Sequence, residues 1–399
     1  MLSFIRAKLF IVIVPTDNIL SPNAYFYMLR TPSPLLLAAI TALLALYLAS
    51  LWVPIWVDDF DVYRTTSLLQ GIRPRAFLGT ITSIFNIGPW GFTFLKIAAL
   101  YIWLLLILEK IATKLFDKNG YSKWQLFVFI VLSFIFTFNT VTYMTYAQVG
   151  IIDSIPYLLI LIAVMLLDKV DERSPSLVKI CVINLLLISA VLIHEKSIFD
   201  IAILFIWVFF RSGYKAAIFY ISPSILISLE FLYLVRGQKT SGFTPEEYIQ
   251  IFGWARKFLM EYSLNIYGII IGGGSLWVLY GVFSYQYIRR VLIGRLQKFS
   301  AFLMVFLMLV ICFLPLTVAW DTNRIVGLIW LPTFLLLTRI DLNSLFTKTR
   351  YSFVGLIFLC AFQIAMPPVL IPHIGVVPFN GYGQFARDFL ESSLFHSKK

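Results

Sequence analysis

Charged residues are scarce in this sequence. Only 13% of the 399 residues are Asp, Glu, Lys or Arg, while 60% are hydrophobic. An ordinary soluble domain carries about 25% charged residues. A chain with so little charge cannot cover a water-facing surface, so a soluble globular protein is excluded and most of the chain must face lipid.

Cysteine is scarce too, and the three cysteines are far apart. Cys181, Cys312 and Cys360 each sit within an apolar run with no second cysteine nearby. This spacing excludes a disulfide framework and a cysteine-based zinc cluster. The runs also lack the alternation of apolar and polar residues that a membrane β-strand requires, which leaves helices as the spanning elements.

Long apolar runs recur from residue 35 to residue 369. A helix of about 20 such residues crosses the hydrocarbon core of a membrane. The sequence predicts an all-α integral membrane protein, a single polytopic transmembrane domain over 1–399 with about eleven transmembrane helices. The predicted spans are 34–53, 91–108, 125–143, 152–167, 178–193, 197–210, 216–235, 263–285, 299–318, 325–338 and 351–371.

The net charge of +12 is dispersed over short loops instead of gathered on one face. We therefore expect the basic residues to meet anionic membrane lipids, and we expect no nucleic acid partner. Lys and Arg are most frequent in one set of alternate loops, which includes 109–124, 168–179, 286–298 and 339–350. The positive-inside rule then predicts a multi-pass protein of the cell membrane, of the bacterial inner-membrane kind, with a cytoplasmic N-terminus and a C-terminus outside.

Two of the predicted outer segments, 54–90 and 236–262, contain periodic apolar residues that indicate interfacial helices. The first lies around 77–85. The second follows Thr244, which is suited to cap a helix, and Pro245, which suits the first helical position.

An acidic cluster follows the first predicted span. Asp58 and Asp59 are adjacent, and Asp58 follows Trp56 by two residues. In a loop both carboxylates can converge on Mg²⁺ or Mn²⁺, or one can act as a general base. The alternative is an aromatic belt at the interface with solvated charges beside it.

His194, Glu195 and Lys196 form a turn between two short predicted spans. Such a turn can lie below the headgroups in a cavity, where charged groups are costly and usually functional. The alternative is a plain hairpin in which Lys196 pairs with Asp200 along the next helix.

A third polar cluster, 320–324, joins the ninth and tenth predicted spans and ends in Arg324. A guanidinium held at the membrane surface can bind two phosphate oxygens at once. The alternative is an internal pair between Asp321 and Arg324.

The chain resembles the GT-C superfamily of integral-membrane glycosyltransferases. The resemblance rests on the acidic Asp58-Asp59 pair directly after the first span, the many further spans and the outer loops with interfacial helices. It implies transfer of a sugar from a polyprenyl-phosphate carrier on the non-cytoplasmic face, with Asp59 or Asp58 as catalytic carboxylate or metal ligand and Arg324 as lipid-phosphate contact. The sequence departs from members that have a large soluble C-terminal domain, because only a tail follows His373. We therefore expect a glycan or lipid acceptor instead of a protein.

On this interpretation His194, Glu195 and Lys196 are further contacts to the lipid phosphate or the sugar. Two alternatives remain. One is an O-antigen or polysaccharide polymerase or ligase, although the large late outer loop of those proteins is missing. The other is a transporter or flippase for lipid-linked glycans, although the intramembrane charges are few, with Asp200 and Glu230 as the clear cases, and no internal repeat is visible.

Overall fold

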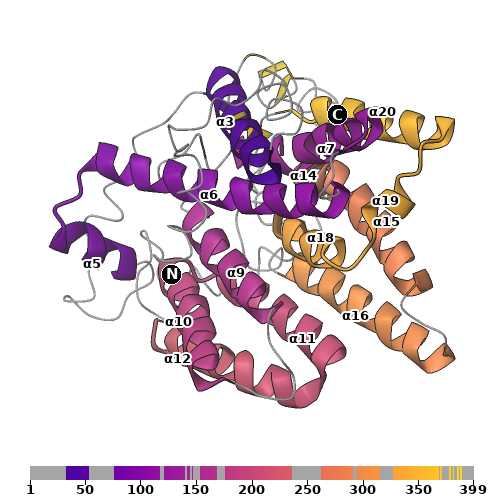
Figure 1. Cartoon of the computed structure of the whole chain (residues 1–399). Coiled ribbons are helices and arrows are strands. Elements are labelled where there is room, and N and C mark those ends of the chain that lie inside the picture. The colour runs from indigo at the N-terminus through magenta and orange to yellow at the C-terminus, as the bar shows by residue number, and fades with distance from the viewer. Residues whose placement is uncertain are drawn as a thin grey trace, which may run out of the picture.

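The computed structural model is a bundle of helices (Figure 1). It describes residues 33–53, 76–116, 121–139, 142, 143, 146, 153–168, 176–235, 262–290, 294–314, 327–367, 369, 370, 377, 378, 381, 384, 385, 387 and 388. The helices are α3 (Pro34–Trp52), α5 (Ala76–Ile84), α6 (Pro89–Leu115), α7 (Lys123–Thr137), α9 (Ser154–Leu167), α10 (Leu177–Ile193), α11 (Ser197–Tyr220), α12 (Ser222–Val235), α14 (Tyr262–Gly273), α15 (Ser275–Arg290), α16 (Arg295–Phe313), η5 (Gly327–Ile329), α18 (Trp330–Leu337), α19 (Leu342–Leu345) and α20 (Arg350–Ile364). Two strands of two residues each, β1 (Val369–Leu370) and β2 (Val377–Pro378), pair antiparallel.

The predicted helical fold class is confirmed, and each predicted span overlaps a helix. Within the described residues, four helices are long and apolar enough to cross a membrane, namely α3, α6, α11 and α16. The bent pair α14 and α15 would make a fifth. The count of eleven spans is therefore not confirmed, because several apolar helices, such as α9 and α20, have only 14 and 15 residues.

Two predicted boundaries differ from the structure for a backbone reason. The sequence predicts one span that ends at residue 210 and a second that begins at residue 216. In the structure α11 instead continues through a kink at Gly213 and ends at Tyr220. Gly213 has a φ of 86°, which a glycine adopts without a steric penalty.

The predicted span 263–285 is two helices that meet at an angle of 71°. The break lies at Gly274, which has a φ of 47°. The amide oxygen of Gln363 in α20 accepts a hydrogen bond from the Ser275 backbone N–H at 2.9 Å. A β-carbon at position 274 would lie 2.7 Å from that same oxygen. Glycine is thus required both by the backbone and by the close approach of α20.

The hydrophobic core has the short helix α18 at its centre. All eight residues of α18 are buried, as expected for a helix that is apolar all round, and it packs against α11, α15 and α16. Trp330 of α18 meets Trp103 of α6 and Tyr157 of α9, with ring centroids 5.1 Å and 5.2 Å away. These rings hold α6, α9 and α18 together in the middle of the bundle.

The outer helices expose apolar faces. In α3, for example, Leu43, Tyr47 and Leu51 are each more than half exposed, while Ala38, Ala42 and Ala49 are buried against the bundle. Small residues let α3 approach α6 closely, and the large side chains on the other face suit lipid. The predicted helix around 77–85 is α5; the predicted helix after Thr244 lies outside the described residues.

Candidate functional site

The turn 194–196 joins α10 to α11 and lies against the first residue before α9. His194 is 4% exposed, Lys196 is 7% exposed and Asp153, which precedes α9, is 1% exposed. The side chains of His194 and Lys196 therefore lie inside the protein, while the prediction that the turn faces a cavity stays a prediction. We call Asp153, His194, Lys196 and the buried Asp200 of α11 the N-terminal cluster, because they surround the N-terminus of α9.

Asp153 lies beside both the imidazole and the ammonium of the turn. Its Oδ2 lies 2.7 Å from Lys196 Nζ, and its Oδ1 lies 3.7 Å from His194 Nε2. His194 Nδ1 accepts the Lys196 backbone N–H at 3.3 Å, so the ring proton is placed on Nε2, toward the carboxylate. The Lys196 ammonium also lies 4.9 Å from the centre of the Tyr157 ring. One carboxylate thus orients an imidazole and an ammonium.

Asp200 is a second carboxylate in the first turn of α11. It is fully buried, and neither of its oxygens has a hydrogen-bond donor among the described residues. The charges of Lys196 and Asp153 both act on it. Lys196 forms its ion pair with Asp153, the residue before α9, and not with Asp200 as the plain-hairpin alternative had it. Asp200 is therefore a buried carboxylate without a hydrogen-bond donor among the described residues.

Lys96 of α6 is linked to the start of α9, beside the N-terminal cluster. It is fully buried, and its Nζ donates to the backbone oxygen of Tyr146 at 3.2 Å. The Ser154 hydroxyl donates to the Lys96 backbone oxygen at 3.0 Å, which ties the start of α9 to α6. Sequence reasoning missed Lys96 and Asp153. The signal that could have found Lys96 was an ionisable residue within a predicted span.

The remaining predicted site residues are placed only in part. Glu195 lies at the edge of the cluster, with its side chain 35% exposed and its Oε2 3.5 Å from His194 Nδ1. Asp58, Asp59 and Arg324 lie outside the described residues. No group of three or more His, Cys, Asp or Glu residues in the described part of the chain is arranged for a metal, which leaves the predicted Asp58-Asp59 metal site untested.

A second ionic cluster lies at the other end of α9. Asp168 follows the last residue of α9 and contacts Lys110 at 3.2 Å, Arg211 at 3.2 Å and also Arg339. We call these four residues the C-terminal cluster. Burial alone would raise the pKa of Asp168, but the three positive charges outweigh this effect and hold the pKa below its ordinary value of 3.8. All four side chains are between 23% and 31% exposed, so this cluster is partly open.

Chemically the N-terminal cluster can bind and transfer protons. A buried imidazole beside a carboxylate is a general base, and a buried ammonium attracts phosphate or carboxylate oxygens. Comparison of the chain with protein-family models, curated proteins and solved structures finds no match. The function must therefore be argued from the site.

Proposed function

We propose that this chain is a membrane-embedded glycosyltransferase of the GT-C type. It moves a sugar from a polyprenyl-phosphate carrier to a glycan or lipid acceptor on the non-cytoplasmic face of a cell membrane. The observation that carries the proposal is the buried cluster of Asp153, His194 and Lys196 at one end of the bundle. Burying such groups costs free energy, so their retention favours a functional role.

Helix α5, which follows the segment that carries the predicted catalytic pair, packs at this same end. Leu78 of α5, Phe92 of α6 and Ile193 of α10 form one buried apolar group, and Ile193 immediately precedes His194. The segment 54–75, which carries Asp58 and Asp59, leads directly into α5. This connection supports an assignment of both acids and the His194 turn to one site.

The proposed transfer assigns one task to each group. The acceptor hydroxyl oxygen attacks the anomeric carbon of the sugar, the bond from that carbon to the phosphate oxygen breaks, and the lipid phosphate leaves with the electron pair. Asp59, with Asp58 beside it, takes the acceptor proton. Arg324, Lys196 and His194 stabilise the negative charge of the departing phosphate. Asp153 is a positioning residue, because it acts by orienting His194 and Lys196.

Amide substitutions test the catalytic assignment. Asp59→Asn should lower turnover about 10²–10⁴-fold while donor affinity stays largely intact, because a general base acts in the transition state. Asp58→Asn should do the same if the carboxylates act together. Arg324→Ala should weaken donor binding as well, and Arg324→Lys should recover only part of it. Transfer from a polyprenyl-linked donor and donor affinity are measured in nanodiscs.

Asp171→Asn, in a predicted cytoplasmic loop, is the control and should change neither quantity. Normal turnover by both Asp58→Asn and Asp59→Asn would remove the catalytic assignment. If the two acids hold Mg²⁺ or Mn²⁺, a chelator should abolish transfer and either ion should restore it. Extension of a glycan polymer as the product would instead favour a polymerase or ligase.

A transporter of lipid-linked glycans is the second candidate function, and Asp200 is the observation that favours it. A buried carboxylate with no described hydrogen-bond donor, within an apolar helix, is typical of a proton or cation pathway. Purified wild-type protein that moves a labelled lipid-linked glycan across a vesicle membrane without transferring sugar would support transport and contradict the glycosyltransferase.

A further inference from the structure

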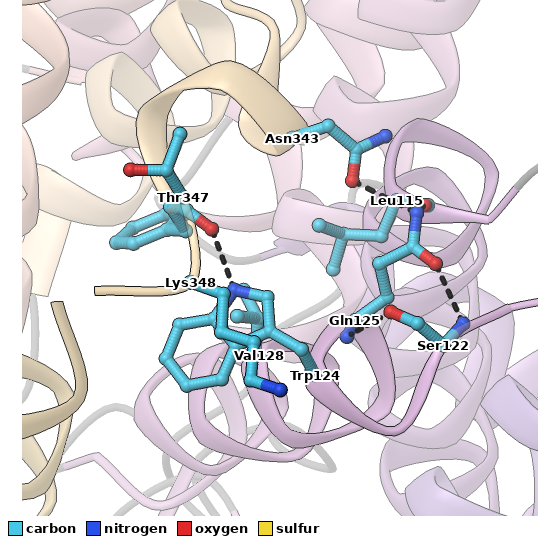
Figure 2. Close-up of a pocket in the computed structure, with 9 residues that line it drawn as sticks. Leu115, Ser122, Trp124, Gln125, Val128, Asn343, Thr347 and Lys348 are labelled. Carbon is cyan, nitrogen blue, oxygen red and sulfur yellow. Dashed lines mark hydrogen bonds between the residues drawn. The ribbon is translucent and has the colours of Figure 1, made fainter. Parts of the chain in front are cut away.

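A groove opens where α7 and α20 begin. Helices α7 and α20 pack side by side. Two adjoining cavities of about 440 and 540 Å³ share Trp124 and Lys348. Figure 2 shows the first of them, with the loop of Thr347 and Lys348 above the first turn of α7. Leu115 at the end of α6 lines this cavity, so the groove lies at the end of the bundle that holds the C-terminal cluster.

One half of the groove is aromatic. The Trp124 and Phe127 rings lie 5.5 Å apart between centroids, and Phe127 stacks on Phe353 of α20 at 5.3 Å. The Trp124 indole donates to the Phe346 backbone oxygen at 2.7 Å, a bond drawn in Figure 2. That bond fixes the indole with its apolar body in the groove wall. Such a wall suits acyl chains close to their headgroup.

The other half is basic. Lys123, Lys348 and Arg350 line the groove and are exposed. No acidic side chain is among the described residues that line either cavity, and within the described chain none of these three cations forms a salt bridge. The nearby Asp341 instead faces Arg290 at 3.9 Å. Three positive charges therefore lack an anionic partner from this part of the protein.

The surface below the basic residues is apolar. On α20, Val354, Ile357 and Phe358 are 57%, 45% and 62% exposed, and Ile130 on α7 is 55% exposed. A ligand held by the cations would thus continue onto an apolar face. Charge at one end and hydrocarbon at the other describe a phospholipid better than a soluble anion.

We propose that this groove binds an anionic phospholipid, with the lipid phosphate between Lys123, Lys348 and Arg350 and the acyl chains along Phe353 and the apolar face of α20. The site is separate from the N-terminal cluster, and the proposal stands whichever chemistry that cluster performs. Phosphatidylglycerol is the probe, because it combines one phosphate charge with two acyl chains.

The test uses the full-length protein, delipidated in a neutral detergent. Native mass spectrometry measures binding of phosphatidylglycerol against phosphatidylcholine to wild type and to the triple variant Lys123→Gln, Lys348→Gln and Arg350→Gln. Each basic residue near an anionic headgroup accounts for about fivefold in affinity, so the triple variant should bind phosphatidylglycerol roughly 100-fold more weakly.

A matched control removes three other exposed cations, one at the end of α15 and two at the start of α16, with Arg289→Gln, Arg295→Gln and Lys298→Gln. This variant should bind phosphatidylglycerol like the wild type. Both variants count as folded if each elutes as a single species in detergent and unfolds at the same temperature as the wild type.

Equal affinities of wild type and the groove variant for phosphatidylglycerol would overturn the proposal, and so would an equal loss in the control variant. Competition with glycerol 3-phosphate distinguishes binding of the whole lipid from binding of its phosphate headgroup alone. If it displaces phosphatidylglycerol at comparable concentration, the site is for a soluble phosphate and the lipid assignment is wrong.

Discussion

Asp153 and Asp168 stand at opposite ends of the same helix, α9, and each binds cations from other helices. At the N-terminus of α9, Asp153 is 1% exposed and contacts Lys196 and His194, and the charge of Lys196 also acts on a second buried acid, Asp200. At the C-terminus of α9, Asp168 is partly exposed and meets three cations, none of which forms a salt bridge with a second acid among the described residues.

The helix dipole sharpens the difference. A negative charge is stabilised at a helix N-terminus and destabilised at a C-terminus. Asp153 sits where the dipole favours it, yet its burial is costly. Asp168 sits where the dipole opposes it, and three cations compensate. The C-terminal cluster is therefore a clamp between α6, α9, α11 and the segment that follows α18, whereas the N-terminal cluster combines deeper burial with a second carboxylate.

The largest expected difference between the two ends comes from removing one lysine. Lys196→Met leaves Asp153 and Asp200 buried without their ammonium and should lower the free energy of unfolding by about 3–5 kcal/mol. Lys110→Met should cost less than about 1 kcal/mol, because Arg211 and Arg339 still contact Asp168. Denaturant titrations in mixed micelles measure both. Equal costs would show that burial does not distinguish the two clusters.

A double-mutant cycle should give the next largest effect. Adding Asp153→Asn to Lys196→Met removes the uncompensated charge, so the double variant should be more stable than the sum of the single costs by about 1–3 kcal/mol. The matched pair Asp168→Asn and Lys110→Met should couple by about 0.5 kcal/mol. Additive costs at Asp153 and Lys196 would contradict the ion pair between them.

The smallest effect is a pH dependence at the exposed end. The pKa of Asp168 is held below 3.8 in the folded protein, so its ion pairs stabilise the fold at neutral pH, and this contribution is lost as the pH falls through the folded pKa. Wild type should exceed Asp168→Asn in stability by about 1 kcal/mol at neutral pH. The difference should begin to shrink as the pH approaches 4 and should disappear only below the folded pKa. Thermal unfolding of both proteins from pH 7 to pH 3 measures this difference in stability. If the difference stays constant over that range, the charge of the Asp168 carboxylate is not its source.

Much of the secondary structure could be predicted from hydropathy. The predicted span 178–193 is α10 within one residue, and 91–108 lies within α6. The three glycines at 272–274 indicate close helix packing or a kink, and the helix is indeed broken there by 71°, but the contact with Gln363 from a distant helix could not be predicted. The helices that are too short to cross a membrane by themselves could not be told apart from full-length spans either. Hydropathy identifies an apolar segment, but it does not give the length of the helix that the segment forms.

The candidate site was predictable only in its local part. The His194 turn stood out because polar residues separated two apolar runs, but the only partner that the sequence suggested for Lys196 was Asp200, in the alternative of a plain hairpin. The ammonium of Lys196 instead meets Asp153, since helices α9 and α11 bring the two together across the bundle.

The sequence by itself determined that this chain is helical and apolar enough for a membrane, because those properties follow from composition and periodicity within single segments. Only the tertiary structure decided which carboxylate pairs with Lys196, which aspartate is left without a described donor, and which cations line a common groove. Pairing energies depend on distances of a few ångströms between residues tens to hundreds of positions apart, and no local pattern encodes them.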